Sequence, residues 1–100
     1  LAILLVPFAE ELFFRAALYG AFVKRMPPFV AFFLATSLFA ALHTQYLLLG
    51  GVAAIVGLGQ VFLLGAILMW LYVKSGSIWP SVFLHVLNNA IAFIALIYLV

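Results

Sequence analysis

The sequence has 100 residues, of which 71% are hydrophobic and only 6% are charged, and its formal net charge is +2. A soluble domain of this length needs a polar surface that these residues cannot supply, so the composition predicts a protein that resides in a lipid bilayer. The small net charge argues against a nucleic-acid partner. Because the sequence contains no Cys, disulfides and thiolate metal sites are excluded.

Long, continuous apolar runs make up most of the chain, without the alternation that membrane strands require. Such runs predict helices, which satisfy their own backbone hydrogen bonds in lipid. Helices are expected near residues 1–25, 28–45, 52–75 and 78–100. We therefore predict an all-α, polytopic membrane helical bundle with about four transmembrane helices of roughly 20 residues each.

Three breaks separate these helices. Residues 24–28 (KRMPP) combine two cations with two prolines, residues 44–51 end in a Gly pair, and residues 74–81 contain a Trp and a Pro typical of a helix start. The interfacial cations Lys24, Arg25 and Lys74 fall in the first and third loops, which lie on one side of the membrane. The positive-inside bias predicts that this side is the cytoplasm.

The chain begins at Leu1 within an apolar run, with neither an initiator Met nor the basic region of a signal peptide. We interpret residues 1–100 as one intramembrane domain and as a fragment of a larger bundle. We expect an integral, multi-pass protein of a prokaryotic plasma membrane.

The first helix carries charges in its interior, at Glu10, Glu11 and Arg15. An ionised side chain at mid-bilayer costs at least roughly 2.5–3.5 kcal/mol on insertion scales, so each needs a reason. Glu11 and Arg15 are four positions apart and can pair on one helix face. A structural pair would explain two of the three charges but would leave Glu10 without a role.

Polar residues of three helices reach a similar depth. Counted from the nearest cation-bearing loop at about 1.5 Å per residue, Glu10 lies about 21 Å deep, His43 about 22 Å and Asn89 about 18 Å. His85, at about 12 Å, precedes Asn89 by four positions and faces the same way. These residues can therefore share one intramembrane site.

Several other residues have simpler interpretations. Phe39 is expected to pack beside the site, and Asn88 shares the face of His85 less well than Asn89 does. Gln60 is expected either to form an interhelical hydrogen bond or to have a functional role. The small residues Gly57, Gly59 and Gly65 are expected to permit close helix packing.

The polar residues suit amide hydrolysis. Glu10 could act as a general base toward water held also by His43, while the N–H groups of His85 and Asn89 could stabilise an oxyanion. A second mechanism stays open, because Glu10, His43 and His85 match the ligand set of a catalytic zinc site. Their spacing is not the local H-E-x-x-H signature, so the sequence does not establish a metal.

Three motifs occur in order along these helices. EELFFR (residues 10–15) matches EExxxR, FAALH (39–43) matches FxxxH, and HVLNN (85–89) matches HxxxN. Together they resemble the CPBP intramembrane proteases, which include the CAAX prenyl endopeptidases of the Rce1 and Abi type. The resemblance covers nearly the whole chain. The sequence departs from the family only in lacking the further helices of full-length members.

The resemblance implies roles for individual residues. Glu10 would be the catalytic glutamate that activates water with His43, and His85 and Asn89 would form the oxyanion hole. The family was long classed as metalloproteases, but we prefer water activated by glutamate without a metal. No cofactor is then required, and zinc is the alternative.

The remaining members of the first motif, Glu11 and Arg15, would support the site. Membrane lipid and a peptide or prenylated-protein C-terminus are the implied partners. In eukaryotic members the last three residues of a prenylated CAAX tail are removed, whereas bacterial members have other roles that include bacteriocin self-immunity.

Two other classes of function compete with an endopeptidase. A component of a proton or ion relay would spread acidic and His groups across the membrane, whereas here they gather at one depth. A catalytically silent immunity or binding protein could retain all three motifs, so the sequence alone leaves it open.

Overall fold

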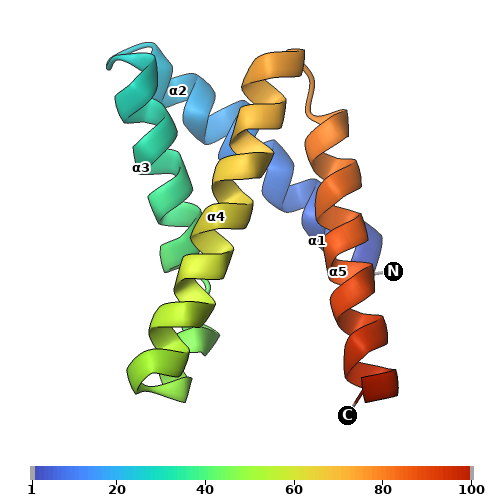
Figure 1. Cartoon of the computed structure of the whole chain (residues 1–100). Coiled ribbons are helices and arrows are strands. Elements are labelled where there is room, and N and C mark those ends of the chain that lie inside the picture. The colour runs from blue at the N-terminus through green and yellow to red at the C-terminus, as the bar shows by residue number, and fades with distance from the viewer. Residues whose placement is uncertain (1, 100) are drawn as a thin grey trace.

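A computed structural model describes the backbone of residues 2–99 and the side chains of residues 4–98 (Figure 1). Within this part the chain is helical and contains no strand, which confirms the prediction of an all-α fold. The elements in chain order are α1 (Ala2–Glu11), the π-helix η1 (Leu12–Tyr19), α2 (Gly20–Val23), α3 (Pro28–Ala41), the 3-10 helix η2 (Thr44–Leu49), α4 (Gly51–Ser75) and α5 (Trp79–Leu99).

The first predicted helix forms one continuous helical path over residues 2–23, whereas residue 1 lies outside the described part. Its middle segment, η1, is wound as a π-helix, which the sequence analysis did not predict. The buried side chains Glu11, Phe14, Arg15 and Tyr19 recur every three to four residues, as on an α-helix. The spacing of the buried residues in the sequence therefore does not distinguish the π-helix from an α-helix.

The prediction of a helix through residue 45 is wrong, because α3 ends at Ala41. In a continued helix the backbone N–H of His43 would donate to the carbonyl of Phe39. It donates instead to the carbonyl of Ala40 at 3.0 Å, and Nδ1 of the His43 ring lies 2.6 Å from the carbonyl oxygen of Phe39. The His43 side chain thus satisfies a terminal carbonyl of the helix, and the helix stops there.

The Gly pair after η2 reverses the chain. Gly50 and Gly51 have φ angles of 70° and 52°, a region that favours glycine. The reversal lays η2 along α4, where the ring of Tyr46 packs directly against Gly57. The prediction of close packing is thereby confirmed for Gly57, but it is wrong for Gly59, because a Cβ there would meet nothing within 4 Å.

One cluster of buried residues lies toward the loops that bear the cations. Ala31 and Ala35 of α3 are fully buried in a cluster with Met69 of α4. Two further contacts hold α5 in place. Ser81 Oγ donates to the carbonyl of Leu68 at 2.7 Å, and the ring of Trp79 stacks on Phe8 at 5.6 Å.

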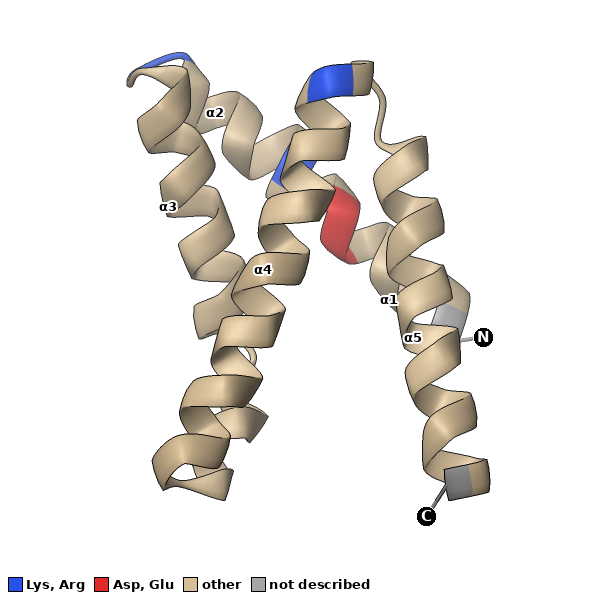
Figure 2. Ribbon diagram, in the orientation of Figure 1, with Lys and Arg blue, Asp and Glu red and all other residues tan. Residues whose placement is uncertain are grey.

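The first helix crosses the bundle. Its α1 segment contacts α5, whereas η1 and α2 contact α3 (Figure 1). The acidic residues, red in Figure 2, consequently lie in the middle of the structure. A crossing helix is what allows one segment to bring its charges to both α4 and α5.

Two helices, Gly51–Ser75 and Trp79–Tyr98, are long and apolar enough to cross a membrane by length and composition. The apolar helix α3, with 14 residues, falls short of the roughly 20 that a span needs. Of the four predicted spans, α4 and α5 therefore have the length and composition of a span, and α3 is shorter than expected. The prediction of four transmembrane helices stays a prediction. Lys74 lies in the last turn of α4, directly before the third loop, and not in the loop itself as predicted. Figure 2 shows the basic residues of the first loop and of the end of α4 at the same end of the structure. That they face the cytoplasm stays a prediction.

Candidate active site

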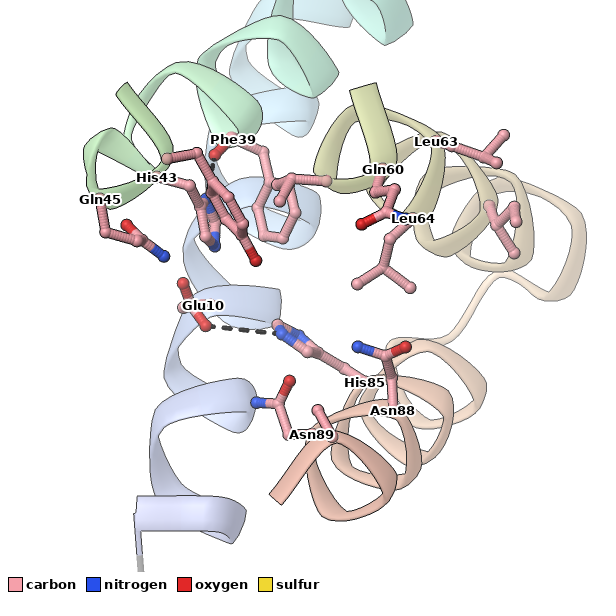
Figure 3. A pocket seen from close by; sticks show the side chains of 14 residues that line it. Glu10, Phe39, His43, Gln45, Gln60, Leu63, Leu64, His85, Asn88 and Asn89 are labelled. Carbon is pink, nitrogen blue, oxygen red and sulfur yellow. Dashed lines mark hydrogen bonds and ion pairs between the residues drawn. The ribbon is translucent and has the colours of Figure 1, made fainter. Parts of the chain in front are cut away.

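A cavity of about 680 Å³ separates α4 from α5. All four residues predicted to act in catalysis, Glu10, His43, His85 and Asn89, line it (Figure 3). They come from α1, from the turn after α3 and from α5, so the fold joins residues that are up to 79 positions apart. The similar depths estimated from the sequence therefore correspond to one shared site.

Behind the cavity wall, Glu11 and Arg15 form the predicted pair. Arg15 Nε lies 3.2 Å from Glu11 Oε1, and both side chains are completely buried. Arg15 Nη2 also donates to the carbonyl of Gly65 at 3.0 Å, and the guanidinium carbon lies 4.5 Å from the centre of the Phe39 ring. Such a buried pair is sensitive to the loss of either partner, which would leave an uncompensated charge.

His85 lies between the two carboxylates. Its Nδ1 is 2.8 Å from Glu11 Oε2, and its Nε2 is 3.6 Å from Glu10 Oε1. The sequence analysis gave Glu11 only Arg15 as a partner, because a contact across 74 residues leaves no periodic signal. Glu11 therefore links Arg15 to His85 and orients the imidazole so that Nε2 faces Glu10 (Figure 3).

The hydrogen bond of His43 determines the form of its neutral ring. A carbonyl oxygen can only accept, so Nδ1 must carry the hydrogen that is directed to Phe39. The neutral ring then has its lone pair on Nε2. The same contact that ends α3 thus leaves Nε2 able to accept a hydrogen bond from water.

Phe39 packs at the centre of the site, as predicted. Its ring is fully buried, with its centre 4.8 Å from that of His43 and 5.9 Å from that of His85. A Cβ at Gly65 would lie 2.8 Å from the Phe39 ring, so the glycine on α4 makes room for it. The close packing predicted for Gly65 is confirmed here.

The three candidate zinc ligands are of types that zinc accepts, but they do not converge. Among the residues that the structure describes, no group of three or more His, Cys, Asp or Glu side chains could hold a metal ion. Nδ1 of each His is occupied by a protein acceptor, and Nε2 of His85 faces the Glu10 carboxylate. We therefore derive no chemical step through a metal, and the preference for a reaction without one stays a proposal.

Further polar residues line the cavity beside the four predicted to act in catalysis. Gln45 and Tyr46 of η2 belong to it, as do Gln60 of α4 and Asn88 of α5. Asn88 had been set aside in favour of Asn89, yet both face the cavity, because it is wide enough to span more than one residue of the α5 surface. These cavity-lining residues come from different helices. Their common position therefore could not be predicted from the spacing of residues along any one helix.

Comparison with known proteins gives one match. A family model described as type II CAAX prenyl endopeptidase Rce1-like matches residues 1–91. The match includes all three motifs and every residue that lines the site except Ala92. No curated protein and no solved structure matches the chain.

Proposed function

The chain belongs to the Rce1-like family of type II CAAX prenyl endopeptidases, and we propose that it is an intramembrane endopeptidase that uses Glu10 to activate water. The family is a protease family whose members are embedded in membranes, so a peptide or protein is the substrate. The observation that carries the proposal is the gathering of Glu10, His43, His85 and Asn89 around one cavity. These are the residue types that amide hydrolysis requires.

The proposed reaction begins with a water molecule between Glu10 and His43. The water gives one proton to the Glu10 carboxylate, while its second hydrogen is held by Nε2 of His43. The resulting hydroxide attacks the carbonyl carbon of the peptide bond. When the C–N bond breaks, Glu10 passes its proton to the leaving nitrogen, and the products are a carboxylic acid and an amine.

In this scheme His85 and Asn89 stabilise the tetrahedral intermediate by donating hydrogen bonds to its oxyanion. Nε2 of His85 can donate while Nδ1 donates to Glu11 only if both nitrogens carry a hydrogen. The charges of Glu10, Glu11, Arg15 and such a His85 sum to zero.

The substrate that we propose is a C-terminal peptide of the CAAX type, prenylated or not, with bacteriocin self-immunity as a bacterial use of the same reaction. The first and third loops, with their cations, are proposed to face the cytoplasm of a prokaryotic cell. The grouping of acidic and His residues at one level favours hydrolysis over a relay, which needs such groups along a path.

The decisive experiment uses the intact protein in liposomes with a fluorogenic prenylated peptide. We expect Glu10→Ala and His43→Ala each to lower kcat at least about 100-fold, because general base catalysis contributes factors of this size. Thr44→Val, a neighbouring residue outside the cavity lining, serves as the control. Turnover at the wild-type rate in the Glu10 variant would refute the proposal, and proton flux that depends on Glu10 would favour a relay.

Whether a metal takes part is decided separately. Activity that survives exhaustive chelation, in protein without stoichiometric zinc by elemental analysis, would support water activated by Glu10 alone. Activity lost on chelation and restored by zinc would contradict the proposed mechanism while leaving the endopeptidase assignment intact.

A further inference from the structure

The cavity contains every carboxamide side chain of the sequence. The chain has two Gln and two Asn residues, which are Gln45, Gln60, Asn88 and Asn89. All four line this one cavity, from η2, α4 and α5. The proposed chemistry uses only Asn89, so three carboxamides remain to be explained in a chain that is otherwise so poor in polar groups.

These three amides do not hold the helices together. In the part of the chain that the structure describes, the side chains of Gln45, Gln60 and Asn88 form no hydrogen bond with another protein group, and all three are exposed. The interhelical hydrogen bond considered for Gln60 is therefore not formed. An amide without a partner is costly in an apolar environment, so these groups favour a polar occupant of the cavity.

The amides lie on both sides of the catalytic groups. Figure 3 shows Gln45 at one edge of the cavity near His43 and Gln60 and Asn88 at the opposite edge, with Glu10 and His85 between them. A ligand that contacts amides at both edges must therefore pass the catalytic groups. This is the path that a chain cleaved between Glu10 and His85 would follow.

A carboxamide offers one carbonyl acceptor and an NH₂ donor, which match the N–H and C=O of a peptide group. A peptide in helical form has already paired these groups, whereas an extended one in a low-dielectric site has not. Building on the proposed function, we infer that Gln45, Gln60 and Asn88 bind the backbone of an extended substrate segment on both sides of the scissile bond. Because the amides are neutral, they select an unwound backbone rather than charged side chains.

Three near-isosteric variants test this inference in the intact protein, with an internally quenched CAAX-type peptide as the probe. Gln60→Met, Gln45→Met and Asn88→Leu remove the hydrogen-bonding groups with little change in volume. One neutral hydrogen bond corresponds to roughly a 3- to 10-fold rise in KM for each variant, with kcat changed by less than about twofold. Thr44→Val is the matched control and is expected to leave both constants unchanged.

Modified substrates locate each contact and do not depend on how the variants fold. Replacing single backbone amides by esters, away from the scissile bond, removes one N–H donor at a time. We expect at least one ester on each side to raise KM for the wild-type protein, and the penalty at the position bound by Gln60 to vanish in Gln60→Met.

Two outcomes would overturn the inference and are distinguishable. If the wild-type protein cleaves the peptide through Glu10 but no ester raises KM, the amides do not bind the backbone, and the proposed function stands. If the wild-type protein cleaves no form of the peptide, the proposed function fails and the inference fails with it.

Discussion

The two halves of α4 lie in different surroundings. Toward the cation-bearing loop, Leu68 and Met69 are completely buried against neighbouring helices. Toward the other end, Gln60 and Leu63 face the cavity, and the Leu63 side chain is 61% exposed. The comparison teaches that the candidate site lies where α4 and α5 diverge (Figure 1), while another face of the same half of α4 still packs against η2. The packed half holds the elements at fixed positions, and the open half leaves room for a substrate.

The difference between packed and open surroundings is largest for two adjacent residues of the first motif, Glu10 and Glu11. Glu11 is fully buried and contacts Arg15 and His85, whereas the Glu10 side chain is 28% exposed in the cavity. Glu11→Ala would leave Arg15 as an uncompensated buried charge, so we expect a loss of about 3–5 kcal/mol in the free energy of unfolding. Thermal unfolding in detergent measures this effect.

Glu10→Ala is the matched control, because it removes the neighbouring carboxylate without exposing the Arg15 pair. We expect it to unfold within a few degrees of the wild-type protein while losing activity. Equal destabilisation by the two substitutions would show that Glu10 belongs to the packed region, like Glu11.

Gly65 marks the boundary between the two regions, since its carbonyl accepts from Arg15 and its missing side chain admits Phe39. Gly65→Ala forces the new methyl group against the Phe39 ring. Overpacking of this kind costs about 1–3 kcal/mol in stability, and displacement of the ring between His43 and His85 should also lower kcat. Unfolding and peptide turnover report the two effects.

Gly59→Ala is the control on the same helix. A Cβ at Gly59 meets nothing within 4 Å, and Ala is favoured over Gly inside a helix by about 0.5–1 kcal/mol. We expect this variant to be as stable as the wild-type protein or slightly more so. Equal stability and equal turnover of the two Ala variants would show that the contact between Gly65 and Phe39 contributes to neither.

The smallest effect is expected from Ser81 of α5, which is buried where α5 packs against the packed half of α4. Ser81→Ala removes the hydrogen bond to the carbonyl of Leu68 and should lower stability by about 1 kcal/mol, with no change in kcat. Ser37→Ala, at a half-buried Ser without a hydrogen bond among the described residues, should change neither quantity. Lost turnover in Ser81→Ala would show that the packed half also acts in the reaction.

The sequence predicted those features that depend on spacing within one helix. Glu11 and Arg15 pair because residues four apart share a helix face, and the breaks at the Pro and Gly pairs fall near their predicted positions. The contact of Glu11 with His85 could not be predicted, because it depends on how α1 crosses α5. Rules of helix depth indicated that such residues could meet, but not which atoms would.

The end of α3 was mispredicted for a different reason. His43 terminates the helix by bonding to the carbonyl of Phe39, a choice of side-chain rotamer that no apolar pattern records. The shared position of the carboxamides could not be predicted either, for a third reason. Each had an ordinary interpretation when taken singly, and only their common position around the cavity distinguishes them from packing residues.

The early end of α3 also affects how water, the second reactant of the proposed hydrolysis, reaches the cavity. With 14 residues, α3 is about 21 Å long, whereas the hydrocarbon core is about 30 Å thick. The turn at His43 would therefore place non-helical backbone at membrane depth, which is tolerated only against protein or a hydrated cavity. The shortened helix thus favours hydration of the cavity within the bilayer, beside the residue proposed to hold the attacking water.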